Sequence, residues 1–209
     1  MAAAEQRQLV HRGPTLSDDL PAARQVVDAI SSWRLEEPGG LVVAIDGHGA
    51  AGKSVIAAAV SLMLPAAIVH LDDFFRVAGS TAGDGQSPMA AYYDWERLRR
   101  ELLEPLRRGR RASFRAFDWE SNAYLPGLVV VDPAEVILLE GVSSTTTALA
   151  DLVDRTVLVA TPEAERVARL HERIGDELWD DEWLAAEQSY FADRPEGWFD
   201  LVVCGSATS

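Results

Sequence analysis

The sequence has 209 residues, of which 48% are hydrophobic and 25% charged, and its formal net charge is −14. Such a chain is long enough for one domain that buries most of its apolar surface. Because phosphate backbones select basic surfaces, the acidic charge argues against a nucleic-acid polymer or an anionic membrane as partner. An anionic small molecule would need a local cluster of positive groups.

Three features of the sequence also predict a cytoplasmic protein. Residues 1–13 lack the apolar core of a secretory signal. The longest apolar stretch, residues 57–71, is interrupted by Pro65 and is too short to span a bilayer. Cys204 is the only cysteine, which excludes an internal disulfide, and its setting in LVVCG predicts a buried strand.

The first forty residues are typical of a helical lead-in to a single domain formed by residues 41–209. Ser17 or Asp18 is a candidate cap for a helix that continues through VVDAISSW. The segment Pro38-Gly39-Gly40 is expected to end that helix.

A strand, a glycine-rich loop and a helix follow in that order. Residues 41–46, LVVAID, predict a buried parallel strand because apolar side chains occupy both of its faces. The loop GHGAAGKS follows at 47–54, and SVIAAAVSLML at 54–64 predicts a helix. Residues 66–73, AAIVHLDD, predict a second buried strand that ends in two aspartates.

The middle of the chain has a weaker pattern. Residues 77–90 are rich in Gly and Ser and predict a mobile loop. Residues 95–109 predict an amphipathic helix, in which leucine recurs at every fourth position. Residues 113–119 predict a short strand.

Strands and helices alternate again in the last third. Strands are predicted at residues 134–142, 155–161 and 200–205, with helices at 162–174 and 180–193. This alternation predicts a doubly wound α/β fold of the P-loop NTPase type. We expect a mostly five-stranded parallel sheet with helices on both faces and a small lid.

The loop GHGAAGKS matches the phosphate-loop pattern G-x-x-x-x-G-K-[ST] and lies between a predicted strand and helix, as that pattern requires. Glycine permits positive φ, so that backbone N–H groups surround the phosphate oxygens, and the helix adds its N-terminal dipole. Lys53 is the only lysine in the chain. Its compact ammonium reaches between β- and γ-phosphate oxygens, where a broad guanidinium does not fit. The residues expected to bind the nucleotide are Gly47, Gly49, Ala50, Ala51, Gly52, Lys53, Ser54 and Val55.

A phosphate loop alone does not separate switch GTPases, large ATPases and small-molecule kinases. GTPases of the Ras type read guanine with N-K-x-D, which needs a second lysine that this chain lacks. A kinase needs a carboxylate that accepts the proton of the acceptor hydroxyl. Asp72 and Asp73 follow the second strand, at the edge where α/β sheets bind ligands. Capping of a turn is the alternative for either residue.

The order of the motifs resembles the uridine kinase-like family of P-loop kinases, whose relatives include phosphoribulokinase and bacterial pantothenate kinase. The segments that carry the resemblance are GHGAAGKS, HLDDFFR, YYDW, RAFDW, VILLEGV and ATPEAERVARLHER. The resemblance implies an enzyme that uses ATP and Mg²⁺, with Asp72 as the general base. It also implies that Glu140 lies near Mg²⁺, which the hydroxyl of Ser54 binds.

The resemblance also implies where the acceptor binds. Asp94 matches an acidic residue that holds sugar hydroxyls in that family, and Arg76 matches an arginine whose role stays open. A Y-D-F-x-x-H element reads uracil in uridine kinases. Its Tyr, Asp and His positions hold Phe117, Asp118 and Asn122 here, so we expect an acceptor other than uridine. With Asp72, these residues form the expected acceptor site.

Arginines are expected to complete the catalytic machinery. Arg166 and Arg169 lie on one face of the predicted helix at 162–174, and the resemblance implies that this lid helix brings them to the nucleotide phosphates. A solvated face with salt bridges is the alternative, because acidic residues lie nearby. The basic segment 107–115 is interpreted as a helix end followed by an exposed turn.

We therefore expect ATP- and Mg²⁺-dependent phosphoryl transfer to a hydroxyl of a small molecule, either a nucleoside or another polyol-like compound. Lys53, Asp72, Arg166 and Arg169 would carry the catalysis, with the lid excluding water. A nucleotide-binding regulator without transfer activity is one alternative. A kinase for pantothenate, a sugar phosphate or an antibiotic hydroxyl is another. The tryptophans of the helix near the C-terminus, Trp179 and Trp183, are expected to pack against the core, or instead to form a wall of the acceptor site or a dimer face of a homo-oligomer.

Overall fold

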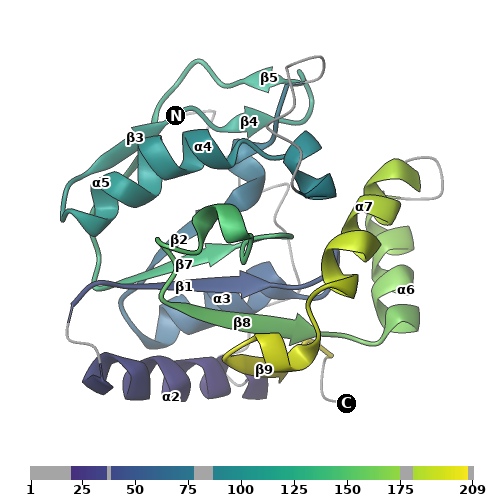
Figure 1. Cartoon of the computed structure of the whole chain (residues 1–209), viewed down its shortest axis with the longest axis horizontal. Helices are drawn as coiled ribbons and strands as arrows, with labels where there is room; N and C mark the ends of the chain where they lie inside the picture. Colours follow the sequence, from purple (N-terminus) through teal and green to yellow (C-terminus); the bar gives the residue numbers. More distant parts are fainter. Residues whose placement is uncertain (1–19, 37–38, 78–86, 175–180, 207–209) are drawn as a thin grey trace.

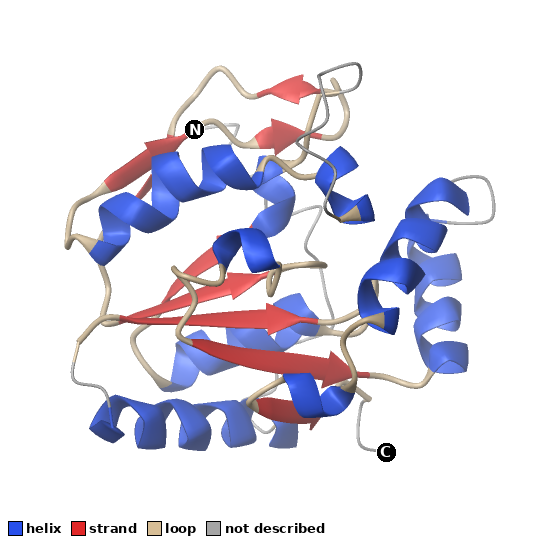
Figure 2. Ribbon diagram, in the orientation of Figure 1, coloured by secondary structure: helices blue, strands red, loops and turns tan. Residues whose placement is uncertain are grey.

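The computed structural model describes residues 20–36, 39–77, 87–174 and 181–206. Its centre is a five-stranded sheet with the order β2-β7-β1-β8-β9, in which every neighbouring pair is parallel (Figures 1 and 2). This is the doubly wound α/β architecture that the alternating segments predict. The strands are β1 (Leu41–Asp46), β2 (Ala67–His70), β7 (Val136–Glu140), β8 (Arg155–Ala160) and β9 (Leu201–Cys204).

Helices cover both faces of the sheet (Figure 1). The side chains of β1 alternate between them: Val43 and Ile45 pack with α2 and α3, whereas Val42 faces the helical layer of α4 and α5. Two further helices, α6 and α7, stand side by side at the carboxyl ends of β1 and β8. The helices are α2 (Pro21–Glu36), α3 (Lys53–Met63), α4 (Trp95–Leu98), α5 (Glu104–Arg107), α6 (Glu163–Ile174) and α7 (Asp181–Ala192), and a π-helical turn, η3 (Arg99–Leu103), joins α4 to α5.

Short elements complete the chain. Two antiparallel pairs, β3 with β6 and β4 with β5, form a region at the edge of the α4–α5 layer (Figure 2). They are β3 (Ala112–Phe114), β4 (Phe117–Asp118), β5 (Ala123–Tyr124) and β6 (Val129–Val131). The 3₁₀ helices are η1 (Leu71–Phe74), η2 (Pro88–Ala91), η4 (Thr147–Leu149) and η6 (Glu196–Trp198).

Three expectations about the elements are wrong in detail. The second strand ends at His70, and the two aspartates lie in η1, since Asp stabilises turns more readily than strands. The expected short strand at 113–119 is split between β3 and β4, which belong to different sheets. Cys204 is exposed, because β9 is an edge strand of the main sheet.

The helix expected at 95–109 forms, but its middle is wider than an α-helix. Proline lacks a backbone N–H, and its ring clashes with the carbonyl four residues earlier. Pro105 lies in α5 immediately after the π-helical turn, which relieves that clash.

Part of the lead-in packs into the main core. The buried residues of α2 are Ala22, Ala23, Val26 and Ile30, which form one stripe along the helix and belong to the same cluster as β1 and α3. The expected capping residues, Ser17 and Asp18, lie outside the described residues, as do Pro38, residues 78–86 of the expected mobile loop and Trp179. None of the helices described here is long and apolar enough to cross a membrane.

Candidate active site

The segment between β1 and α3 has the backbone of a phosphate loop. Gly47 has a φ of 147°, and a Cβ atom there would lie 2.6 Å from the carbonyl oxygen of Val159. Gly52 has a φ of 103°, which disfavours any residue with a side chain. The loop therefore needs glycine at these two positions, both to turn and to stay close to β8.

Lys53 is the first residue of α3 and is only 7% exposed. Its Nζ donates hydrogen bonds to the carbonyl oxygens of Gly47 and His48, at 2.7 and 2.8 Å. The ammonium is therefore held over the loop that it belongs to. The only lysine of the chain thus lies where a bound phosphate would need a positive charge.

Asp46, which sequence reasoning did not single out, anchors the start of this loop. It is fully buried, and its carboxylate accepts hydrogen bonds from the backbone N–H groups of Gly47, Ser143 and Thr145 at 2.8, 2.9 and 3.0 Å. The hydroxyl of Tyr190 in α7 donates to the same carboxylate at 2.8 Å. These contacts tie the loop to the segment after β7 and to α7.

Glu140, at the end of β7, faces the loop because the register pairs it with Ile45 of β1 and with His70 of β2. Ser54 Oγ donates to Glu140 Oε2 at 3.1 Å, and His70 Nδ1 lies 2.5 Å from Oε1. Burial opposes ionisation, but the hydrogen bond from His70 and the charges of His70 and Lys53 lower the pKa of Glu140 below its usual value. The carboxylate is therefore charged at neutral pH.

The donor set around Ser54 and Glu140 fits Mg²⁺. A hydroxyl and a carboxylate oxygen are ligands that this ion accepts, and Mg²⁺ in kinases commonly takes its remaining ligands from water and substrate phosphates. Among the described residues, no group of three or more His, Cys, Asp or Glu side chains is arranged to hold a metal ion. The pair therefore suits an ion that arrives with the nucleotide.

Asp72 is an exposed residue of η1, just after the end of β2. Tyr93 donates a hydrogen bond from its hydroxyl to Asp72 Oδ1 at 2.9 Å. The pKa of Asp72 is raised above its usual value, mainly because the surrounding protein atoms displace water from the charged form. The like charge of Glu140 raises it further. A carboxylate with a raised pKa is a better proton acceptor than an ordinary aspartate.

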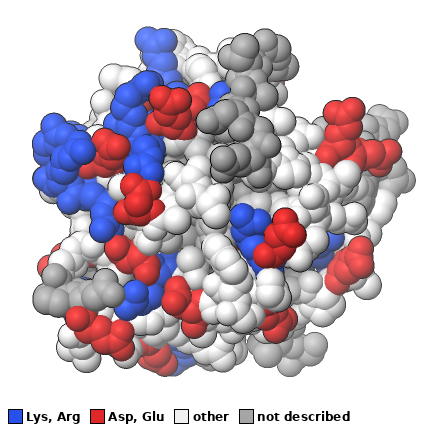
Figure 3. All heavy atoms as spheres, viewed as in Figure 1, with Lys and Arg blue, Asp and Glu red and all other residues white. Residues whose placement is uncertain are grey.

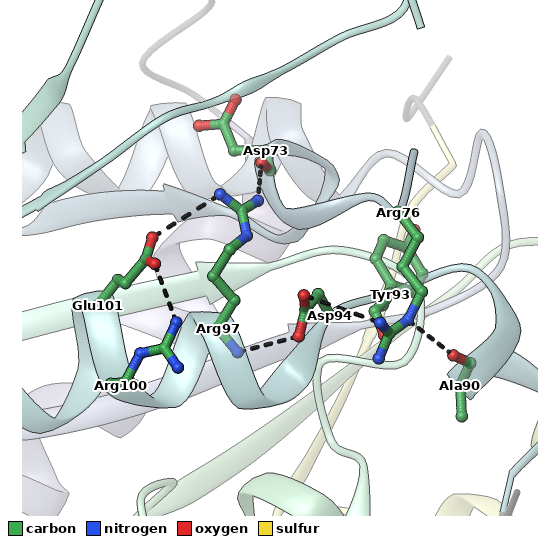
Figure 4. Close-up of polar contacts among 8 residues, drawn as sticks. All are labelled: Asp73, Arg76, Ala90, Tyr93, Asp94, Arg97, Arg100 and Glu101. Atoms are coloured by element: carbon green, nitrogen blue, oxygen red, sulfur yellow. Dashed lines mark hydrogen bonds and ion pairs between the residues drawn. The ribbon is translucent and has the colours of Figure 1, made fainter. Parts of the chain in front are cut away.

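Two of the expected acceptor residues, Arg76 and Asp94, come together (Figure 4). Arg76 Nε donates to the carbonyl oxygens of Ala90 and Tyr93, at 3.2 and 3.1 Å, and its Nη1 lies 3.8 Å from Asp94 Oδ2. Asp94 Oδ1 accepts from the backbone N–H of Arg97 at 3.0 Å and caps α4. One oxygen of Asp94 is thus used in the fold, and the other faces Arg76.

The remaining acceptor candidates are divided between two environments. Phe117 is buried in an aromatic cluster, with its ring 5.3 Å from Phe75 and 5.1 Å from Trp119. Asp118 and Asn122 lie at the exposed turn between β4 and β5, where Asn122 has a φ of 47°. A hydrogen bond from Ser121 lowers the pKa of Asp118. Phe117 therefore faces η1, whereas Asp118 bonds within its own turn.

Of the two expected lid arginines in α6, Arg169 contacts the phosphate loop, and Arg166 pairs with Glu187, which bonds to that loop. Arg169 donates from Nη1 to the carbonyl oxygen of Ala50 at 3.3 Å and from Nη2 to that of Gly205 at 3.1 Å. Arg166 is 6% exposed, so it does not lie on a solvated face. An ion pair between Arg169 and Glu165 shows that the salt-bridge alternative also holds in part.

Basic side chains gather on the surface over the α4–α5 layer, interspersed with acidic ones (Figure 3). Arg107 and Arg111 each lie 2.6 Å from a carboxylate oxygen, of Asp154 and Asp132 respectively. Arg108 pairs with Glu104 of its own helix. These pairs offset the local charge and support the interpretation of segment 107–115 as a helix end with an exposed turn.

Four residues of the site escaped sequence reasoning: Asp46, His70, Tyr93 and Glu187. His70 stands beside the aspartates in HLDD, so its place at a strand end was a usable signal. Tyr93 belongs to the YYDW segment, but only the fold brings it to Asp72. The sequence around Glu187 is that of an ordinary amphipathic helix with exposed glutamates. Nothing in it indicates that this glutamate is buried at the phosphate loop.

No protein-family model and no curated protein sequence matches this chain. Solved structures do match it. A protein described as a possible uridine kinase from Bacillus stearothermophilus is 21% identical with a TM-score of 0.63, over 86% of this chain and 97% of that one. A candidate fructose transport system kinase from Silicibacter sp. TM1040 is 24% identical with a TM-score of 0.67, over 88% and 99%. The chain has a P-loop kinase fold.

This P-loop kinase fold also extends to the YGR205w protein, at 11% identity and a TM-score of 0.57, over 90% of this chain and 95% of that one. The fold-level resemblance to uridine kinase-like proteins that the motif order indicates is thereby confirmed. At these identities the architecture is shared, and the acceptor has to be argued from the residues of this chain.

Proposed function

We propose that this protein is an ATP- and Mg²⁺-dependent kinase that transfers the γ-phosphoryl group to a hydroxyl of a small molecule. One observation carries the proposal. The phosphate loop, with Lys53 and the Ser54–Glu140 pair, lies at the same edge of the sheet as Asp72, the carboxylate with the raised pKa. A phosphate donor and a proton acceptor at one edge are the two requirements of such a transfer.

Each residue has a role in this proposal. Backbone N–H groups between Gly49 and Ser54 hold the β-phosphate, and Lys53 bridges the β- and γ-phosphates. Mg²⁺, held by Ser54 and Glu140, would offset the charge of the phosphate oxygens. Asp72 accepts the proton of the acceptor hydroxyl. Arg166 and Arg169 stabilise the charge of the transferring group and help to exclude water.

The acceptor is a nucleoside or another compound with several hydroxyl groups. Asp94 and Arg76, next to Tyr93, offer polar contacts on one side of Asp72. Phe117 and the aromatic rings around Phe75 offer an apolar wall. The changes from Tyr to Phe and from His to Asn in the uracil-reading element favour an acceptor other than uridine.

A nucleotide-binding regulator is the second candidate, and pantothenate, a sugar phosphate or an antibiotic are acceptors that remain open. The carboxylate at position 72 argues against the regulator, because a protein that only binds ATP needs no base there. A sugar phosphate would call for cations beside the acceptor in addition to Arg76, which pairs with Asp94. A cytoplasmic location and a homo-oligomer stay predictions.

The test is ADP production from Mg-ATP across a panel of nucleosides, vitamins, sugar phosphates and antibiotics, with Asp72→Asn in parallel. We expect one acceptor class to stimulate ADP formation in the wild type, and a loss of about 100-fold or more in the variant. Phosphorylated product identified by mass spectrometry would name the hydroxyl. Tight ATP binding with no acceptor-stimulated turnover, or unchanged turnover by Asp72→Asn, would contradict the proposal.

A further inference from the structure

A carboxylate of α7 occupies part of the phosphate loop. Glu187 is 1% exposed, and its Oε1 accepts a hydrogen bond from the backbone N–H of Gly49 at 2.5 Å. The N–H groups of a phosphate loop are the groups that bind phosphate oxygens. A side-chain anion therefore holds one donor of the loop from within the protein.

The other neighbours of Glu187 are also those that a phosphate would attract. Arg166 Nη1 lies 3.9 Å from Glu187 Oε2 and is a buried nitrogen with no hydrogen-bond partner. His48 Nδ1 lies 3.5 Å from Oε1. The carboxylate thus lies between the loop and the lid helix. The guanidinium beside it belongs to Arg166, whose Nη1 donates no hydrogen bond.

Glu187 is an anion at neutral pH. Its burial opposes ionisation, but contacts with His48 and the N–H of Gly49 outweigh this and lower its pKa below the usual value for glutamate. A nucleotide phosphate brought to the same N–H group would meet this negative charge at close range in a largely water-free place.

We propose that Glu187 is an internal stand-in for a nucleotide phosphate, which holds the empty loop and the lid together and must leave when ATP binds. This inference rests on the proposed function. It predicts that the affinity of the wild type for ATP is reduced by the need to displace Glu187, as in any protein whose binding-competent state is a minor one. It also predicts that departure of Glu187 frees Arg166 to reach the incoming phosphate.

The position of Glu187 in α7 makes the displacement a movement of the helix. One turn earlier, Trp183 packs against Tyr92 with ring centroids 4.9 Å apart. One turn later, Tyr190 is bound to Asp46. Glu187 cannot leave the loop without strain on these neighbours, so nucleotide binding is coupled to the segment that carries Tyr92, next to Tyr93 and Asp72.

The experiment compares the Kd of Mg-ATP, measured by titration calorimetry without acceptor, in the wild type, Glu187→Gln, Glu187→Ala, Lys53→Ala and Asp193→Asn. Asp193 is an exposed carboxylate just after α7 and serves as the matched control. We expect both Glu187 variants to bind Mg-ATP at least about fivefold more tightly than the wild type, and the control to be unchanged. A residue with a merely structural role would weaken binding when replaced.

Unchanged or weaker binding by both Glu187 variants would overturn the inference. Failure of the proposed function gives a different result, namely no ATP binding by the wild type or equal binding by Lys53→Ala. If the Glu187 variants do not fold, hydrogen exchange of the wild type decides. We expect faster exchange of the amides of α7 in the Mg-ATP complex than in the free protein, and slower or equal exchange contradicts the inference.

Discussion

Asp72 meets two opposing demands. The proposed role of Asp72 as general base requires it to be ionised, yet this carboxyl lies among protein atoms and near Glu140, both of which favour its neutral form. The hydrogen bond from Tyr93 works in the opposite direction, because it stabilises the charged form. The raised pKa of Asp72 is the net result, and it makes the residue a stronger base at a cost in stability.

The pH dependence of the reaction and of stability should both report on Asp72. Since the base has to be deprotonated, kcat/KM should fall as the pH falls through a pKa above the usual value for Asp. For stability the sign is reversed, because the folded state binds the proton more readily than the unfolded state. Ionised Asp72 therefore costs stability above its folded pKa, and Asp72→Asn should raise the Tm at neutral pH.

Scanning fluorimetry at two pH values checks this prediction. The gain in Tm from Asp72→Asn should be present at pH 7 and should shrink as the pH is lowered through the raised folded-state pKa toward the usual Asp value. A lower Tm for the variant at pH 7 would mean that the charge of Asp72 is stabilised rather than strained.

At this scale, the sequence indicates the backbone geometry of the phosphate loop, where the residues are contiguous. The loop from Gly47 to Ser54 carries its own geometry, because glycine positions and the lysine act within one turn of chain. Asp46 and Glu187 were not predicted, because their partners lie about a hundred residues away or more, at Ser143 and Gly49 respectively. Such pairs become visible only when the topology is known.

Among the elements, η1 is held in place by a buried arginine of α4. Arg97 donates to the carbonyl oxygen of Asp73 at 3.0 Å (Figure 4) and to that of Arg115 at 2.7 Å. Its guanidinium lies over the rings of Phe74 and Tyr124. The contacts connect the base-bearing turn to the start of the β4–β5 region. Arg97 is thus a positioning residue for Asp72.

Arg97→Met should loosen this connection. The hydrogen bonds from Arg97 to two carbonyl oxygens would be lost, at a cost of about 1–3 kcal/mol in the free energy of unfolding. Because η1 also moves, kcat should fall more than the affinity for Mg-ATP. Urea unfolding and steady-state kinetics would measure the two effects.

Arg100→Met is the matched control, since Arg100 lies on the exposed side of the same helical segment and bonds to Glu101. Its effect on unfolding should stay within about 0.5 kcal/mol. Equal effects of the two substitutions would show that Arg97 acts only as one more surface cation.

Local sequence also explains which elements were predicted well. The buried strands β1, β7 and β8 have continuous apolar runs and formed within two residues of the expected bounds. The shorter pieces were missed because β4 and β5 are only two residues long, too short for a periodic pattern. The π-helical turn before Pro105 was missed because the leucine pattern alone does not show how a helix accommodates proline.

At the scale of the whole molecule, a buried hydrogen-bond network at the carboxyl edge of the sheet fixes the positions of the loops. Asp46 joins β1, the segment after β7 and α7 through a buried network in which Thr145 Oγ1 also lies 2.9 Å from the hydroxyl of Tyr190. Burial and the charge of Asp46 raise the pKa of Tyr190, which keeps its proton available for these bonds. The network makes α7 part of the phosphate loop's support.

Tyr190→Phe should remove the hydrogen bonds of the hydroxyl and keep the aromatic ring in the core. Loss of a hydrogen bond to a charged group costs about 1.5–3 kcal/mol, so we expect a clear fall in Tm. Tyr124→Phe keeps an aromatic ring at another site and should leave the Tm nearly unchanged. A Tyr190→Phe variant with the wild-type Tm would show that the buried hydroxyl contributes nothing to the network.

The solitary lysine gives the molecule a chemical handle. Acylating reagents that attack side-chain amines have one target in all 209 residues, and that target lies in the phosphate loop. Acylation at Lys53 would remove the charge and block the loop in a single event, and a ligand that fills the loop would shield the amine. Mass spectrometry of the peptide that contains acylated Lys53, which trypsin does not cleave at that residue, can therefore measure the occupancy of the nucleotide site without any engineered label.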